Sequence, residues 1–138
     1  MSTTRIITLL MPLPTYYNPD SRGTRKPIEK RKFTQTAREI SEHFNAGAEL
    51  QVFRRDKPHG FWWDRGFLSR DVLAYISADL PDTEETRVWM KAYARRTLLN
   101  RFRQDAIYWR WLAVETELVR ASEHVSQEDD GESSGDTR

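Results

Sequence analysis

The order in which two apolar periods alternate along the chain is the feature that most constrains its fold. Runs that are rich in β-branched residues, or apolar at every second position, fall at residues 5–11, 48–53, 67–78 and 106–114. Stripes with apolar residues three and four apart fall at residues 33–44 and from 82 to about 102. Period two indicates strands and period 3.6 indicates helices, so the predicted order is βαββαβ.

This order predicts an α+β fold of the ferredoxin-like class. Each half is a β-α-β unit, and right-handed crossovers place both helices on one face of an antiparallel four-stranded sheet. The expected strand order 4-1-3-2 puts the two most apolar strands, residues 5–11 and 67–78, in the centre. The chain resembles the superfold in element order alone, and such a resemblance does not define a function.

Local signals set the expected ends of these elements. Pro12 and Pro14 are expected to end the first strand, and Asn45 with Gly47 to end the first helix. Asp82 is expected to cap the second helix, because acidic residues follow it in the first turn. Two connections stand out, a long basic loop at residues 13–32 and an aromatic hairpin at residues 59–66.

Charge divides the chain into a basic body and an acidic end. Residues 1–114 carry a net charge of +7, and residues 115–138 carry −6. We expect one domain at residues 1–118 and a disordered acidic tail at residues 122–138, where no core-forming pattern remains. The tail is expected to screen the basic surface of the body.

Several classes of protein do not fit the sequence. Cysteine is absent, which excludes disulfides and thiolate sites. No apolar run approaches the length of about 18 residues that spans a bilayer, so we expect a cytoplasmic protein without membrane contact. No phosphate-binding or dinucleotide motif occurs, and the pair of Glu39 and His43 is read as a surface contact. We therefore expect no cofactor and no metal site.

The open face of the sheet is the first candidate surface. The last strand presents either Trp109 and Trp111 or Tyr108 and Arg110 to that face, and Tyr75 lies on the neighbouring central strand. An aromatic, apolar face is rarely left in water. The alternation therefore predicts a homodimer through this face, cover by the two long connections, or a ligand pocket beneath that cover.

The basic loop is the second candidate surface. It suits phosphate groups or an acidic protein, although a run of cations is also a common solvated loop. Its cations, with two from the following turn, are Arg22, Arg25, Lys26, Lys30, Arg31, Lys32, Arg54 and Arg55.

The aromatic hairpin is the third candidate. His59 could act as a general base with Asp64 nearby, and Arg65 could bind an anionic group. Trp62 and Trp63 would line such a pocket. The structural alternative is a hairpin whose indoles cover the core and whose Asp64 organises the turn.

These surfaces favour a non-enzymatic binding or regulatory protein. In this hypothesis the chain associates through its aromatic sheet face and presents the basic loop to an acidic protein or nucleic acid. One alternative is a small cofactor-independent enzyme or ligand-binding protein of the dimeric α+β barrel type. Another alternative is a small phage or mobile-element inhibitor of a host complex.

Overall fold

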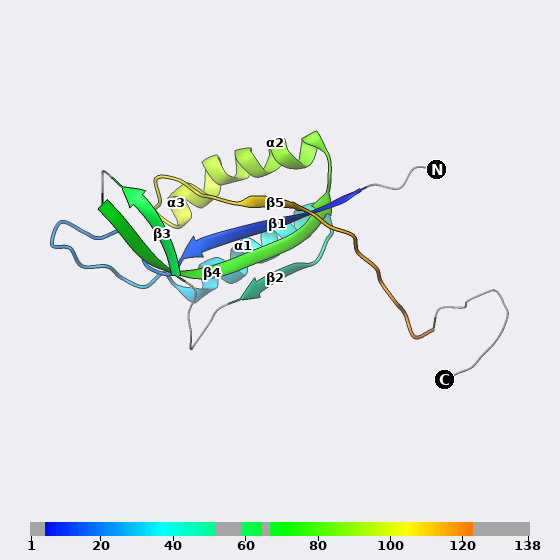
Figure 1. The fold of residues 1–138 in the computed structure, drawn as a ribbon, viewed down its shortest axis with the longest axis horizontal. Helices are drawn as coiled ribbons and strands as arrows, with labels where there is room; N and C mark the ends of the chain where they lie inside the picture. The colour runs from blue at the N-terminus through cyan, green and yellow to red at the C-terminus, as the bar shows by residue number, and fades with distance from the viewer. Residues whose placement is uncertain (1–4, 52–58, 65–66, 123–138) are drawn as a thin grey trace.

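The computed structural model describes residues 5–51, 59–64 and 67–122, and within these ranges the chain forms one sheet and two helices (Figure 1). The elements in chain order are β1 (Ile6–Pro14), α1 (Lys30–Phe44), β2 (Ala48–Gln51), β3 (His59–Asp64), β4 (Phe67–Pro81), α2 (Glu84–Tyr93), the π-helical turn η1 (Ala94–Leu98), α3 (Leu99–Arg101) and β5 (Arg110–Ala113). The segments α2, η1 and α3 run on without a break and form the second helix.

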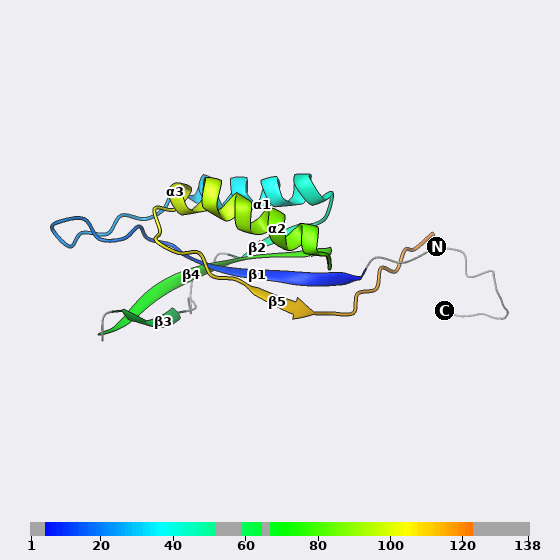
Figure 2. The same ribbon diagram turned by 90° about the horizontal axis from the view of Figure 1, so that it is seen from above.

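The sheet has five strands, and every described strand pair is antiparallel. The order β2-β4-β1-β5 places β1 and β4 in the centre, and β3 pairs with the N-terminal part of β4. Figure 2 shows both helices above one face of the sheet, while the other face carries no helix. The mixed α+β class is therefore confirmed, with five strands in place of the four expected.

The fifth strand exists because β4 is much longer than its neighbour β2. The ladder between these two strands runs only from Ala48–Ala78 to Gln51–Tyr75, which leaves the first part of β4 without β2. There β3 takes over, from the pair His59–Val72 to the pair Asp64–Phe67. The strands β3 and β4 are thus paired on either side of the predicted reversal, whose residues 65–66 lie outside the described part of the chain.

The first strand does not end at Pro12, contrary to the sequence expectation. It continues to Pro14, because β5 contacts β1 only from Ile7 to Leu10. Beyond Leu10 one side of β1 has no neighbour among the described strands, and a residue without an N–H is tolerated on such an edge. The last strand is shorter than expected and covers residues 110–113 of the predicted 106–114.

The helix ends are set by local chemistry. Asn45 adopts the left-handed conformation with φ 52°, so it ends α1 as expected. The cap of α2 is Thr83 and not Asp82: the Thr83 hydroxyl accepts a hydrogen bond of 3.1 Å from the Thr86 N–H. The Asp82 carboxylate instead lies 2.8 Å from the Arg87 guanidinium.

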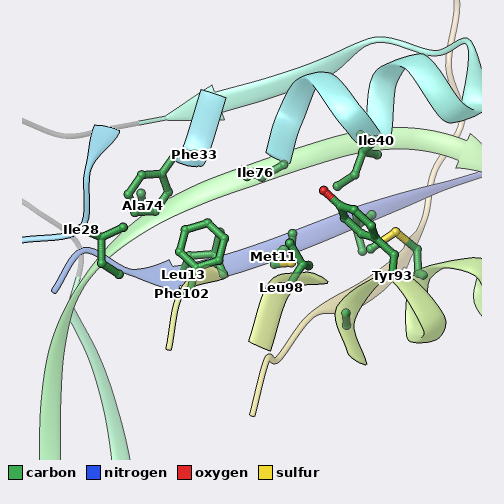
Figure 3. Packing of buried hydrophobic residues seen from close by; sticks show 14 of the residues in the cluster. Met11, Leu13, Ile28, Phe33, Ile40, Ala74, Ile76, Tyr93, Leu98 and Phe102 are labelled. Atoms are coloured by element: carbon green, nitrogen blue, oxygen red, sulfur yellow. The ribbon is translucent and has the colours of Figure 1, made fainter. Parts of the chain in front are cut away.

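The core lies between the sheet and the two helices (Figure 3). Alternate residues of β1 and β4 fill it, among them Leu9, Met11 and Ile76, all fully buried. Phe33 of α1 meets Phe102, which follows α3, with ring centroids 5.2 Å apart. These contacts fix both helices on the sheet and leave its opposite face uncovered by any described helix.

Candidate functional site

The open face of the sheet follows from the strand register. Directly opposed residues of antiparallel strands lie on one face, so Leu10 shares its face with Ser77 of β4 and Arg110 of β5. Thr8 likewise shares it with Leu112. The open face is therefore a mixture of apolar, hydroxyl and charged side chains.

The same register places the tryptophans of the last strand on the helix-covered face. Trp111 opposes Leu9, which is fully buried, and both Trp109 and Trp111 pack against the core. The Arg87 guanidinium of α2 lies 5.2 Å from the Trp111 ring centroid. Tyr108 and Arg110 therefore have the parity of the open face. Tyr75 also lies on the open face, whereas Trp109 and Trp111 do not.

Exposed apolar side chains are concentrated in β5 and in the chain that flanks it. Eight large hydrophobic residues are exposed among those that the structure describes, and five of them lie between residues 108 and 119. They belong to β5 and the chain just before and after it: Tyr108, Leu112, Val114, Leu118 and Val119. The sequence analysis did not predict a surface at Leu118 and Val119. The spacing of Leu112, Val114 and Leu118 could have indicated one.

Two pairs of hydroxyl and carboxylate groups stand on the open face. The Thr8 hydroxyl donates to Asp79 at 2.6 Å, and the Ser77 hydroxyl donates to Glu49 at 3.3 Å. The described residues contain no group of three or more His, Cys, Asp or Glu side chains that could hold a metal ion. Two carboxylates on separate strand positions are fewer ligands than a protein cage for a divalent cation uses.

A polar cluster joins the two helices on the other side of the sheet. The Glu39 carboxylate of α1 accepts hydrogen bonds from the Tyr93 hydroxyl at 2.7 Å and from Arg101 at 3.1 Å. Arg101 also donates to the hydroxyl of Thr36, which is fully buried and itself donates to the Lys32 carbonyl at 2.7 Å. Figure 3 shows the Tyr93 hydroxyl directed toward α1.

The π-helical turn explains how Tyr93 and Arg101 reach the same carboxylate. In a regular α-helix two residues eight positions apart diverge by about 80° around the axis. The Leu99 N–H bonds to the Ala94 carbonyl five residues back, so η1 absorbs one extra residue. The angle between Tyr93 and Arg101 around the helix axis then matches that of residues seven positions apart, about 20°, so both side chains face Glu39. No local sequence pattern predicted this turn.

The charges of the cluster are held in place by its hydrogen bonds. Burial by itself raises the pKa of Glu39, but the hydrogen bonds from Tyr93 and Arg101 and the positive charge of Arg101 hold the pKa below its ordinary value. Burial, followed by the nearby Glu39 carboxylate, raises the pKa of Tyr93. The cluster therefore holds an ionised Glu39 and a neutral Tyr93 at neutral pH.

The basic loop makes ordered contacts within itself and with the body of the protein. Tyr16 and Pro27 form a bridge between its two arms, and the buried Tyr17 hydroxyl donates to the Glu29 carboxylate. That hydrogen bond, the largest cause, and the charge of Lys32 lower the pKa of Glu29. Lys32 donates to the Tyr17 hydroxyl at 2.6 Å and to the Arg101 carbonyl at 3.0 Å.

The predicted loop cations therefore differ in what they do. Arg25 donates to the Tyr17 carbonyl at 2.8 Å, and Lys32 has a side chain that is only 15% exposed, so these two serve the fold. Exposed cations of the group are Arg22, Lys26, Lys30 and Arg31. Arg54 and Arg55 lie outside the described residues.

The structure describes only part of the predicted polar site in the hairpin. His59 is exposed at the start of β3, which pairs along its length with β4. Trp62, Trp63 and Asp64 lie on β3, whose backbone pairing is described, while Arg65 lies outside the described residues. The acidic tail expected at residues 122–138 also lies outside them, apart from residue 122.

The histidine that shares a helix face with Glu39 makes an aromatic contact. The His43 ring stacks on Trp89 of α2 with centroids 4.0 Å apart, and Trp89 stacks on Tyr93 at 4.7 Å. Glu39 accepts hydrogen bonds from Tyr93, Arg101 and Gln35, the last at 3.2 Å, so the two residues of the predicted surface pair have separate partners.

No protein-family model and no curated protein matches the sequence. Solved structures do match the fold. The divalent cation tolerance protein CutA1 from Thermus thermophilus gives a TM-score of 0.56 at 9% identity, over 82% of this chain and 87% of that chain. CutA1 from Oryza sativa gives 0.57 at 11% identity, over 84% and 85%. CutA from Synechococcus elongatus gives 0.52 at 10% identity, over 83% and 80%.

These neighbours correct the function expected from the sequence. The neighbour from Thermus thermophilus is named a divalent cation tolerance protein, and this is the finding against a protein that presents a basic loop to an acidic protein or nucleic acid. In the described part of the chain, no helix is both long and apolar enough to cross a membrane.

Proposed function

We propose that the protein is a self-associating, ferredoxin-like protein of the cytoplasm that takes part in tolerance to divalent cations. The fold is supported by the sheet order β2-β4-β1-β5 with both helices on one face, to which β3 adds a hairpin strand. The cation-related role rests on likeness to structures of CutA1 proteins, which is an argument at the level of the fold.

Self-association is supported by the row of exposed apolar side chains at the β5 edge. Leu112 and Val114 are each 39% exposed and Leu118 is 67% exposed. Apolar side chains that are exposed near one another commonly mark a contact with another protein. A homodimer is the smallest assembly that covers this surface, and the exposed side chains are the observation on which the proposal of self-association depends.

The described residues do not supply a preformed metal cage within one chain. Glu49 and Asp79 are the carboxylates that strand pairing places on the open face, and each already accepts a hydroxyl hydrogen bond. We therefore assign no metal-dependent step to these residues. A role in cation tolerance is compatible with weak binding at the surface or with action on other components of the cell.

A growth assay tests the cation-related role. Deleting the protein from its source organism should lower the concentrations of Cu²⁺, Zn²⁺ and Co²⁺ that arrest growth, and Mg²⁺ serves as the control ion. The wild-type chain should restore tolerance when it is expressed from a plasmid. Equal growth of the deletion and parent strains at every concentration would refute the proposal.

Calorimetry with purified protein separates direct binding from an indirect role. The chain is titrated with Cu²⁺ and Zn²⁺, and the combined change of Glu49→Gln and Asp79→Asn is compared with Glu42→Gln on the exposed surface of α1. Binding that is lost only in the first variant assigns the ion to the open face. Binding that is equal in both variants excludes these two carboxylates as ligands.

A further inference from the structure

Three aromatic side chains form a continuous stack that leads from the surface into the layer between the two helices. The ring centroids of His43 on α1 and Trp89 on α2 lie 4.0 Å apart, and the two planes differ by 12°. The centroids of Trp89 and Tyr93 lie 4.7 Å apart, and these planes differ by 17°. His43 is exposed, Trp89 is half-buried and Tyr93 is only 5% exposed. Aromatic contact therefore leads from solvent to a buried phenol.

The buried end of this stack has a proton acceptor already in place. The Tyr93 hydroxyl, which points toward α1 in Figure 3, donates to a Glu39 carboxylate oxygen at 2.7 Å. Arg101 and Gln35 donate to the other oxygen of that carboxylate. These hydrogen bonds hold the carboxylate against the phenol and lower its pKa, so it is ionised at neutral pH. Glu39 is thus a fixed base beside the Tyr93 proton.

A buried phenol in this position gives up an electron readily only if it also gives up its proton. Oxidation of tyrosine without proton loss leaves a positive charge on the ring, and an unpaired charge in a buried place is costly. A base within hydrogen-bond reach can take the proton as the electron leaves. The Trp89 indole stacks on the phenol and can take the electron once it has itself been oxidised. The arrangement therefore suits coupled transfer of an electron and a proton.

We propose that Trp89 and Tyr93 form an electron-transfer relay that reduces oxygen-centred radicals at the protein surface. Such a radical takes one electron from the Trp89 indole and becomes an anion, which takes a proton from water. The oxidised indole then takes one electron from Tyr93, whose O–H bond breaks and whose proton passes to the Glu39 carboxylate. The products are the restored indole, a neutral tyrosyl radical and a neutral carboxylic acid. This inference rests on neither the cation-related role nor the self-association proposed above.

A second tyrosine of the chain provides a matched control. Tyr17 is also buried, and its hydroxyl also donates to a carboxylate, that of Glu29. Its ring lies against two cations, however, with Arg103 Cζ 4.7 Å and Lys32 Nζ 5.0 Å from the ring centroid. Nearby positive charge disfavours the removal of an electron. We therefore expect the oxidation to fall on Tyr93 and not on Tyr17.

The test oxidises the purified chain by flash photolysis with a ruthenium polypyridyl complex, whose photogenerated trivalent form takes up one electron. Transient absorption and electron paramagnetic resonance measure the radical that persists after the short-lived signals of exposed tyrosines have decayed. The wild type is compared with Tyr93→Phe, Trp89→Phe, Glu39→Gln and the control Tyr17→Phe. Circular dichroism confirms that each variant is folded.

The wild type and Tyr17→Phe should form a persistent neutral tyrosyl radical, and Tyr93→Phe should form none. Trp89→Phe should form it more slowly, because phenylalanine is much harder to oxidise than tryptophan. Glu39→Gln should form it about 100-fold more slowly, because an amide is a far weaker proton acceptor than a carboxylate. The rate in the wild type should also fall in heavy water, which is a measurement that needs no variant.

The inference is overturned if the wild type forms no persistent radical or if Tyr93→Phe keeps it. It is equally overturned if Trp89→Phe or Glu39→Gln reacts at the wild-type rate, or if the wild type reacts equally fast in heavy and ordinary water. None of these results bears on the growth assay or on self-association, so this inference and the proposed function can fail separately.

Discussion

Replacing Arg101 by Met should destabilise the protein by removing the cation that joins the two helices. The guanidinium lies 3.0 Å from the Glu39 carboxylate and donates to the Thr36 hydroxyl at 2.8 Å. The Arg101 side chain is 13% exposed, so its replacement leaves Glu39 without its cationic partner in a largely enclosed place. Methionine keeps most of the apolar stem and changes mainly the charge.

The size of the effect follows from these contacts. A hydrogen bond to a charged group contributes about 1.5–3 kcal/mol, and breaking a fully buried ion pair costs about 3–5 kcal/mol. The Glu39 side chain is 34% exposed, so solvent screens part of the loss. We expect the free energy of unfolding to fall by about 2 kcal/mol at neutral pH.

The effect should depend on pH in a defined direction. The pKa of Glu39 in the folded state lies below its ordinary value of 4.5, so its ionisation stabilises the fold above that value. This contribution is lost as the pH falls through the lower pKa of the folded state. The difference between wild type and the Arg101→Met variant should therefore shrink when the pH is lowered from 7 toward 3.

Urea unfolding followed by tryptophan fluorescence measures these energies. All samples share one protein concentration, because self-association makes stability depend on it. Arg95→Met on the exposed side of η1 is the matched control and should cost less than about 0.5 kcal/mol. A loss equal to that of Arg95→Met, or losses from Arg101→Met and Glu39→Gln that simply add in the double variant, would refute the reasoning.

Three further changes test the fold. Asn45→Ala should cost about 1 kcal/mol because alanine disfavours the positive φ at the end of α1, and Asn45→Gly should not; equal unfolding midpoints for the two would contradict this account. Thr83→Ala should cost about 1 kcal/mol through the lost helix cap, whereas Thr34→Ala on exposed α1 should cost under about 0.5 kcal/mol. Leu98→Ala should cost about 2–5 kcal/mol, because the side chain is fully buried and its loss leaves a cavity; a loss near zero in urea unfolding would be inconsistent with the core described.

The order of strands and helices was predictable because it depends on local periods. Residues three and four apart mark a helix and residues two apart mark a strand, whatever their distant partners are. The ends of the strands depend on partners that are far along the chain. Pro12 and Pro14 remain in β1 because the pairing between β1 and β5 ends at Leu10. Nothing near these prolines in the sequence indicates where that pairing ends.

The orientation of the last strand is a second feature that could not be predicted from the sequence alone. Alternation alone allowed either Trp109 and Trp111 or Tyr108 and Arg110 on the open face. The pairing of Trp111 with the buried Leu9 decides between them, and register is a property of two strands together. The candidate surface therefore moved from aromatic residues to the apolar edge that continues beyond β5.

The cluster between the helices was not predicted, although its residues are ordinary helix residues. A regular helix would point Tyr93 and Arg101 in different directions, and the π-helical turn at Ala94–Leu98 brings them together. The cost of one irregular turn is offset by the hydrogen bonds that Glu39 gains. Such long-range compensation leaves no trace in local propensity.

Cysteine trapping between two copies tests the central claim most directly, because the chain has no cysteine of its own. Thr116→Cys is mixed in turn with Glu49→Cys on β2, Leu112→Cys on β5 and, as the control, Thr34→Cys on α1, and the mixtures are oxidised. A disulfide forms readily only where two Cα atoms lie about 4.4–6.8 Å apart. The account predicts a covalent mixed dimer with one of the two edge variants and little with the control. If neither edge variant is trapped above the level of Thr34→Cys, the β5 edge does not carry the proposed self-association.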